Sequence, residues 1–254
     1  MRFTVAGIYL IWISALTSIA QSYDHTSVFA HNDYDQPVPF YRAYSLQVGF
    51  IEADIFLQGD QLMVAHHQNE IKVGRTLDSL YLIPLQREIR KNNGSAYADA
   101  GLSLVLMIDL KTEGTSTLKK LADKLSQYNE LITAKNFQVA ISGNVPDPAQ
   151  WKNYPTFIHF DGRPNINYSD EQLARVTLIS NSFGNYSHWD GKGSIPKEDR
   201  KKIEAVVKSV HVRGKKLRFW GAPDFENSWQ TLMKLKVDVI GSDHVPDLVA
   251  YLKR

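Results

Sequence analysis

Short apolar runs alternate with amphipathic stretches along most of the chain. The run at 102–111 is apolar at nearly every position, which is typical of a strand buried on both faces of a sheet. Segment 116–132 instead has its leucines at helical spacing, with Leu118, Leu121 and Leu125 on one face. We predict strands at 27–31, 50–57, 102–111, 137–143, 156–162, 175–183, 216–221 and 237–243.

Helices are predicted between these strands. Segment 197–214 has the clearest signals, because Pro196 precedes it, acidic residues stand in its first turn, and Arg213 and Gly214 end it. The other predicted helices and helical turns are 39–47, 78–94, 116–132, 148–153, 225–236 and 245–252.

The alternation of about eight strands with helices predicts a parallel sheet covered by helices. About eight such units in a chain of 254 residues favour an α/β fold of the closed (β/α)₈, TIM-type barrel. An open doubly wound sheet is the alternative, but that fold usually has a glycine-rich phosphate loop after its first strand. Here the first strand ends at His31 and is followed by Asn32 and Asp33, with no such glycine-rich loop nearby. We expect one barrel domain over 21–254.

The N-terminus predicts a signal peptide over residues 1–20. Arg2 precedes an apolar run from about residue 5 to 16, and the small residues Ser18 and Ala20 stand where a signal peptidase requires them. A membrane anchor is the alternative, although the run is shorter than the roughly 20 residues that a spanning helix needs. We therefore expect an exported bacterial protein, periplasmic or extracellular.

Composition removes several classes of function. The net charge of +2 provides no basic stripe for nucleic acid, so we expect no nucleic-acid partner. The chain has no cysteine, which excludes disulfides, thiolate metal sites and cysteine nucleophiles.

Two carboxylates interrupt the strand at 50–57. Glu52 and Asp54 are two residues apart, so their side chains point to the same side and would repel unless a cation lies between them. Asp109, at the end of the next strand, adds a third oxygen donor. Three carboxylates suit one hard divalent cation, Mg²⁺ or Ca²⁺. The alternative is that Glu52 and Asp54 face solvent or pair with Arg42 or Lys111.

Two histidines stand where catalytic residues of a barrel gather, at the carboxyl ends of strands. His31 ends the first strand, and His66 ends the hairpin that follows the second. Two imidazoles across a reacting phosphorus can serve as base and acid, although a histidine at a strand end is also a common hydrogen-bonded rim residue.

Four further residues are candidates for binding substrate. Lys111 shares a face with Asp109 and can pair with a phosphate oxygen, or simply neutralise that aspartate. Trp220 ends the seventh strand and can form a pocket wall, and Asn32 and Asn181 can orient oxygens.

These residues, in this order, resemble the PLC-like phosphodiesterase superfamily, which includes glycerophosphodiester phosphodiesterases, phosphatidylinositol-specific phospholipases C and sphingomyelinases D. The resemblance covers nearly the whole chain after the leader, and its pattern is a histidine, E-x-D, a second histidine, then an acid and a lysine. The matching residues are His31, Glu52, Asp54, His66, Asp109 and Lys111. The resemblance implies a TIM barrel and a metal-dependent phosphoric diester hydrolase.

The chain departs from the glycerophosphodiesterases at two motifs. AHNDY replaces their usual histidine-arginine-glycine, and LMIDLKT has aspartate where they usually have glutamate. The D-L-K-T run resembles sphingomyelinases D, whereas AHNDY most resembles the branch of the "altered inheritance of mitochondria" type proteins. The resemblance implies that the substrates are glycerophosphodiesters or phospholipid headgroups. They would be cleaved either by hydrolysis or by attack of a substrate hydroxyl, which forms a cyclic phosphate. A non-catalytic barrel that binds phosphorylated headgroups is the alternative from another class.

A monomer that binds a small-molecule or lipid phosphodiester is expected. Transient contact with a membrane surface is expected through Phe183, Tyr186 and Trp189, in the loop before 197–214. The alternative is that these aromatic residues pack as a cover on the barrel.

Overall fold

Eight parallel strands follow one another around a sheet in the order of the chain. The computed structural model describes residues 21–254. The eight strands are β1 (Val28–Ala30), β2 (Phe50–Gln58), β4 (Leu104–Leu110), β5 (Phe137–Gly143), β6 (Ile158–Gly162), β7 (Val176–Ser182), β8 (Leu217–Trp220) and β9 (Ile240–Ser242). Their order is β8-β7-β6-β5-β4-β2-β1-β9, and β3 (Gln61–Val64) returns antiparallel to β2.

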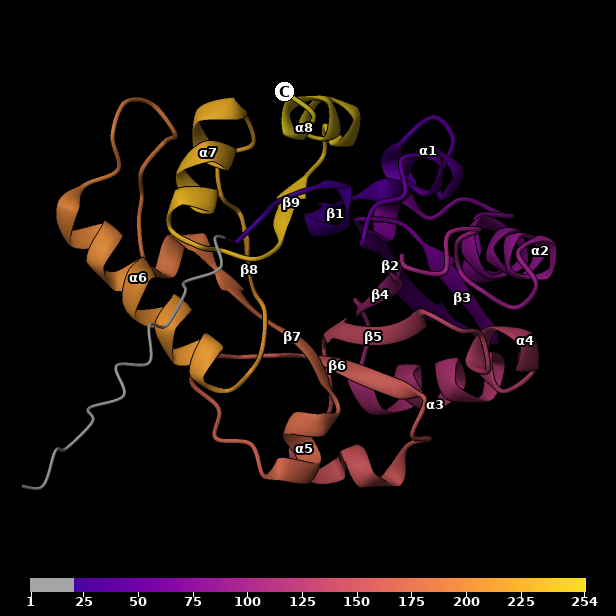
Figure 1. Ribbon diagram of the computed structural model, residues 1–254. Helices are drawn as coiled ribbons and strands as arrows, with labels where there is room; N and C mark the ends of the chain where they lie inside the picture. The colour runs from indigo at the N-terminus through magenta and orange to yellow at the C-terminus, as the bar shows by residue number, and fades with distance from the viewer. Residues whose placement is uncertain (1–20) are drawn as a thin grey trace, which may run out of the picture.

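The two ends of this sheet meet. β1, the first strand, pairs with β9, the last one, and a parallel bridge joins Arg218 of β8 to Val239 just before β9. In Figure 1 the indigo β1 and the yellow β9 lie side by side accordingly. The predicted TIM-type barrel is confirmed.

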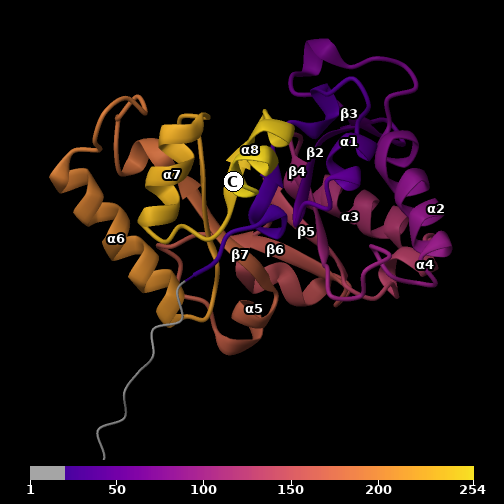
Figure 2. The same ribbon diagram turned by 45° about the horizontal axis from the view of Figure 1, so that its top comes forward.

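Helices cover the outside of the barrel. In Figures 1 and 2, α6 and α7 lie on one side, α2, α3 and α4 on the opposite side, and α8 beside β1. The α-helices are α1 (Tyr41–Ser45), α2 (Ile83–Lys91), α3 (Gly114–Leu125), α4 (Asn129–Ile132), α5 (Asp170–Ala174), α6 (Lys197–Val212), α7 (Glu226–Lys234) and α8 (Val245–Leu252). Short 3₁₀ turns are η1 (His25–Ser27), η2 (Asp33–Asp35), η3 (Gln68–Glu70), η5 (Pro148–Asn153) and η6 (Phe183–Asn185), and the π-helical turn η4 (Asp78–Leu82) leads into α2.

The core has two layers. The larger layer lies between strands and helices, and the buried leucines Leu118, Leu121 and Leu125 of α3 belong to it, as their spacing predicts. The smaller layer fills the barrel, where Phe29 and Phe50 stack with ring centroids 5.9 Å apart. Because apolar side chains fill the inside below the strand ends, the cavity described below is confined to the mouth of the barrel.

Two predicted helices differ in detail from the observed ones. Segment 116–132 is two helices, because α3 ends at Leu125, where the Ser126 hydroxyl donates a hydrogen bond back to the Ala122 carbonyl. The short helical turn expected at 148–153 is a 3₁₀ turn.

The predicted signal peptide, residues 1–20, lies outside the described residues. Within residues 21–254, no helix is both long and apolar enough to cross a membrane. Phe183 and Trp189 are buried, and the ring of Tyr186 lies 5.2 Å from that of Phe219. These aromatic residues therefore pack as a cover on the barrel.

Gly143 ends β5 against the neighbouring strand. Its φ of +75° belongs to the left-handed region, and a Cβ atom there would lie 2.5 Å from the carbonyl oxygen of Leu110 and 2.9 Å from Oδ2 of Asp109. Gly59, in the β2–β3 turn, has a φ of +58° but open space around it. An alanine at either position would therefore have the same unfavourable φ, but only an alanine at Gly143 would also collide with the neighbouring strand.

Replacing Gly143 with alanine is expected to destabilise the fold more than the same change at Gly59. Left-handed strain costs both variants about 1–2 kcal/mol, and overpacking adds about 1–3 kcal/mol to Gly143→Ala alone. Chemical denaturation of Gly143→Ala and Gly59→Ala measures the difference. Equal losses of unfolding free energy would show that the contact with β4 is unimportant.

Candidate functional site

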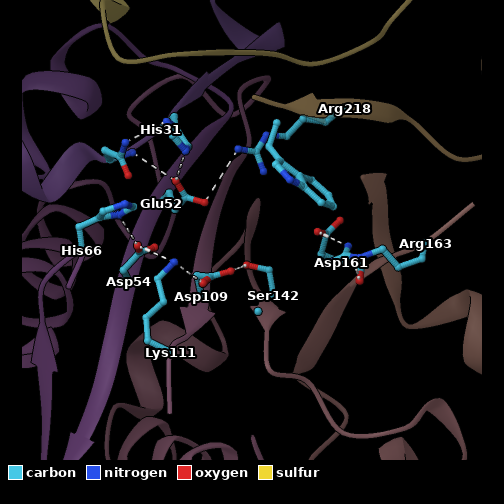
Figure 3. Close-up of a pocket in the computed structure, with 13 residues that line it drawn as sticks. His31, Glu52, Asp54, His66, Asp109, Lys111, Ser142, Asp161, Arg163 and Arg218 are labelled. Atoms are coloured by element: carbon cyan, nitrogen blue, oxygen red, sulfur yellow. Dashed lines mark hydrogen bonds and ion pairs between the residues drawn. The ribbon is translucent and has the colours of Figure 1, made fainter. Parts of the chain in front are cut away.

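A cavity of about 310 Å³ opens at the carboxyl ends of the strands. Its lining comes from β1, β2, β3, β4, β5, β6 and β8 or the segments that follow them (Figure 3). The lining residues are His31, Asn32, Glu52, Asp54, His66, Asp109, Lys111, Ser142, Gly143, Asp161, Arg163, Arg218 and Trp220. This is the end of a TIM barrel at which ligands bind.

Strand register brings the carboxylates together. Asp54 of β2 is paired with Asp109 of β4, which is paired in turn with Ser142 of β5. Glu52 and Asp54 point into the barrel, and only 6% and 2% of their surfaces are exposed. Ser142 donates a hydrogen bond of 2.7 Å to Oδ1 of Asp109.

Lys111 neutralises part of this charge. Its ammonium nitrogen lies 2.8 Å from Oδ2 of Asp54 and 2.8 Å from Oδ2 of Asp109. Burial nevertheless raises the pKa of Asp54 to about 6; the neighbouring Glu52 and Asp109 add to the rise, and Lys111 opposes it. Glu52, Asp54 and Asp109, which we call the acidic cluster, thus have one ammonium in contact with two of the three carboxylates.

His31 is held from the side of β9. Its Nδ1 lies 2.7 Å from Oδ1 of Asp243, and its Nε2 lies 3.7 Å from Oε2 of Glu52. The backbone N–H of Asp243 donates to Asp224, which fixes the aspartate that orients the imidazole. Burial lowers the pKa of His31, but the hydrogen bond to Asp243 and the charge of Glu52 outweigh it, so the pKa lies above its usual value.

His66 is held from the side of β2. Its Nδ1 lies 3.3 Å from Oδ2 of Asp54 and 3.0 Å from the hydroxyl of Tyr34, which is itself 2.7 Å from the same Asp54 oxygen and 2.6 Å from Oδ1 of Asn32. A hydroxyl has one hydrogen, so Tyr34 donates to one of these three partners at a time, and it accepts from the imidazole only in the tautomer whose Nδ1 carries a proton. Tyr34 is fully buried and was not among the predicted site residues.

The structure brings all but one of the predicted site residues to the cavity. The exception is Asn181, whose Oδ1 accepts hydrogen bonds from the Ser182 backbone and from Asn185, outside the cavity lining. Ser180 of the same strand points inward instead and donates to Oδ1 of Asp161. The expectation that Asn181 contacts substrate is therefore not supported by its position.

Sequence reasoning missed Asp161, Arg163 and Arg218, which also line the cavity. A signal for Arg218 was available, because it stands two residues before Trp220 on a strand and so shares its inward face. The same spacing argument identified Glu52 and Asp54.

The acidic cluster has the chemistry of a hard-cation site but not its arrangement. Its donors are carboxylates, which Mg²⁺ and Ca²⁺ prefer. Within residues 21–254, however, no group of three or more histidine, aspartate or glutamate side chains is arranged to hold a metal ion. The ammonium of Lys111 lies 2.8 Å from an oxygen of Asp54 and 2.8 Å from an oxygen of Asp109.

Comparison with known proteins identifies the family. The model of the AIM6-like phosphodiesterase domain matches residues 17–145, about half of the chain. The chain belongs to this family. It is 26% identical to the altered inheritance of mitochondria protein 6 homolog of Arthroderma benhamiae over 86% of this chain and 81% of that protein. With altered inheritance of mitochondria protein 6 of Eremothecium gossypii it shares 27% identity, over 86% of this chain and 67% of the relative.

A solved structure supports the fold. The glycerophosphodiester phosphodiesterase of Parabacteroides distasonis superimposes with a TM-score of 0.56 at 17% identity, over 91% of this chain and 98% of the other. The resemblance to the PLC-like superfamily, on the "altered inheritance of mitochondria" side, is confirmed.

One expectation is wrong. An exported bacterial protein was predicted from the leader, whereas the named relatives come from fungi, including Lachancea thermotolerans, and their names refer to mitochondria. These relatives point to a eukaryotic protein.

Asp33 holds the loop that carries Asn32 and Tyr34. Its Oδ2 accepts hydrogen bonds from the Phe40 backbone at 2.6 Å and from the Tyr81 hydroxyl at 2.9 Å. Oδ1 is buried without a hydrogen-bond partner among the described residues. Burial raises the pKa of Asp33 to about 6, although the two hydrogen bonds oppose the shift.

The folded state therefore favours the protonated, neutral form of Asp33, and the protein is more stable when this carboxyl is protonated. Its contribution is fully present below the unfolded pKa of about 3.9 and is lost as the pH rises through about 6. We expect Asp33→Asn to remove this loss, which is of the order of 3 kcal/mol. Denaturation of both proteins between pH 4 and pH 7 measures it, and parallel stability curves would contradict the assignment.

Proposed function

We propose that this protein cleaves phosphodiesters, with His31 and His66 as the two proton carriers. One observation supports this most directly: both imidazoles lie at one cavity, and each has its Nδ1 held by a carboxylate, Asp243 or Asp54. Holding Nδ1 fixes the ring and leaves Nε2 to exchange protons with substrate.

In the proposed reaction, one histidine takes the proton of the attacking oxygen. That oxygen belongs to water, which gives hydrolysis, or to a hydroxyl of the substrate, which gives a cyclic phosphate. The other histidine protonates the leaving oxygen as the P–O bond breaks. Lys111 supplies positive charge toward the phosphoryl oxygens, where negative charge is held through the transition state.

The cavity favours a small polar substrate. About 310 Å³ is at the low end of the range for ligand sites, and charged side chains dominate the lining. A glycerophosphodiester or an exposed phospholipid headgroup suits these dimensions. The name of the Parabacteroides distasonis protein, a glycerophosphodiester phosphodiesterase, supports the same substrate class.

Loss of either imidazole is expected to reduce turnover strongly. General acid or base catalysis contributes roughly 10²–10⁴-fold, so His31→Ala and His66→Ala should each lower kcat by about that factor. His188→Ala, at an exposed histidine outside the cavity, is the control. Release of products from glycerophosphodiesters, followed by ³¹P NMR, is the measurement. Wild-type rates in a His31→Ala/His66→Ala protein would refute the mechanism.

We also propose that Glu52, Asp54 and Asp109 bind one Mg²⁺ or Ca²⁺, which competes with Lys111 for the two aspartates. Support comes from the charges at the cavity: the three carboxylates have Lys111 at 2.8 Å from Asp54 and Asp109, and Arg218 at 3.9 Å from Glu52. A bound cation would polarise a phosphoryl oxygen.

Chelation is expected to lower turnover, and Mg²⁺ or Ca²⁺ to restore it. Calorimetric titration with each cation tests binding directly. Asp109→Asn should weaken it about tenfold or more, because one unit of charge is lost. Lys111→Met should strengthen binding, because the competing cation is gone. Asp60→Asn, at an exposed aspartate paired with Lys120, is the control. Turnover in EDTA equal to that in Mg²⁺, with no binding heat, would refute the cation.

A further inference from the structure

The cavity has two chemically different halves. His31, His66 and the acidic cluster form one half, and Arg163 and Arg218 lie in the other (Figure 3). Trp220, whose ring lies 5.0 Å from the guanidinium of Arg163, belongs with these arginines, and we call the three residues the guanidinium half. The proposed proton transfers use the first half. The second therefore needs an explanation of its own.

Arg218 is a buried cation with incomplete pairing. Only 3% of its surface is exposed, and its Nε has no hydrogen-bond partner among residues 21–254. Its nearest carboxylate oxygen in an ion pair is Oε1 of Glu52, 3.9 Å from Nη2. A buried charge is costly unless it is paired and hydrogen-bonded, so Arg218 has capacity left for an anion in the cavity.

Arg163 approaches from the segment after β6. Its Nη1 donates to Oδ2 of Asp161 at 2.6 Å, and Oδ1 of that aspartate accepts from Ser180. Both oxygens of Asp161 thus already accept hydrogen bonds from the protein. Among the described residues, the side-chain hydrogen bonds of Arg163 all leave from Nη1, so its Nε and Nη2 can still donate to an anion in the cavity.

The aromatic faces in this half already hold cations. The guanidinium of Arg163 lies 5.0 Å from the ring centre of Trp220, and that of Arg218 lies 3.4 Å from the ring centre of Phe29. A quaternary ammonium such as choline binds to open aromatic faces. Here it would meet two guanidinium groups instead.

We infer that the guanidinium half binds a second anionic group of the substrate, a carboxylate or a phosphomonoester, in addition to the phosphodiester. The inference rests on the proposed function for the identity of that substrate. It selects anionic headgroups over neutral and cationic ones, with Arg163 and Arg218 as the residues that determine this specificity.

Two headgroup compounds that differ by one carboxylate test the binding step without turnover. O-phosphoserine is expected to bind about tenfold more tightly than phosphoethanolamine, the size of one charge-assisted hydrogen bond. Arg163→Gln should bring the ratio near one, and Arg163→Lys should retain part of it. Arg200→Gln, on α6 in an ion pair with Glu204, is the matched control. Calorimetry gives the dissociation constants.

Equal affinities in the wild type, or a ratio that Arg163→Gln leaves unchanged, would overturn the inference. Measuring the turnover of glycerophosphoserine and of glycerophosphoethanolamine distinguishes a failure of the anionic subsite from a failure of the proposed function. Turnover of both without preference refutes the anionic subsite alone. No turnover of either, with the binding preference retained, refutes the proposed function alone.

Discussion

The arrangement of this site depends on the repulsion between carboxylates that the barrel holds at one level. Asp54 and Asp109 are fixed by the pairing of β2 with β4, and Glu52 lies two residues before Asp54 on the same face. Backbone hydrogen bonds set these positions, so the side chains cannot relieve their repulsion by moving apart. A cation among them or a proton on one of them relieves the repulsion, and in this structure the ammonium of Lys111 lies 2.8 Å from both Asp54 and Asp109. Any divalent ion has to compete with it.

The same constraint places the histidines. His66 reaches Asp54 because the β2–β3 hairpin returns the chain to the mouth, whereas His31 reaches Asp243 because β1 pairs with β9. One imidazole thus depends on a local hairpin and the other on closure of the whole barrel. Loosening the contact between the chain's first and last strands would disturb His31 before His66.

How far the sequence predicts this site depends on strand alternation. Where alternation is regular, as at Glu52 and Asp54 or at Asp109 and Lys111, spacing alone identified residues that line the cavity. Between β6 and β7 the register shifts at Phe160 and Asp161, and no sequence pattern reports such a shift. On β7 the residue expected to bind substrate is Asn181, but it is Ser180 that faces Asp161.

Tyr34 was missed for a different reason. Its position depends on Asn32, whose φ of 48° turns the chain into a left-handed conformation directly after β1. That turn carries the Tyr34 hydroxyl between Asp54 and His66. A loop conformation of this kind has no periodic signal, so the sequence shows the aromatic residue but not its role.

The charges in the middle of the barrel are not explained by stability. Glu52 and Arg218 are both buried and lie 3.9 Å apart, but the cost of desolvating both charges offsets their attraction. Apolar side chains, as in the layer of Phe29 and Met107, would fill that space at lower cost. The charges are therefore better explained by a ligand that they bind than by the fold that contains them.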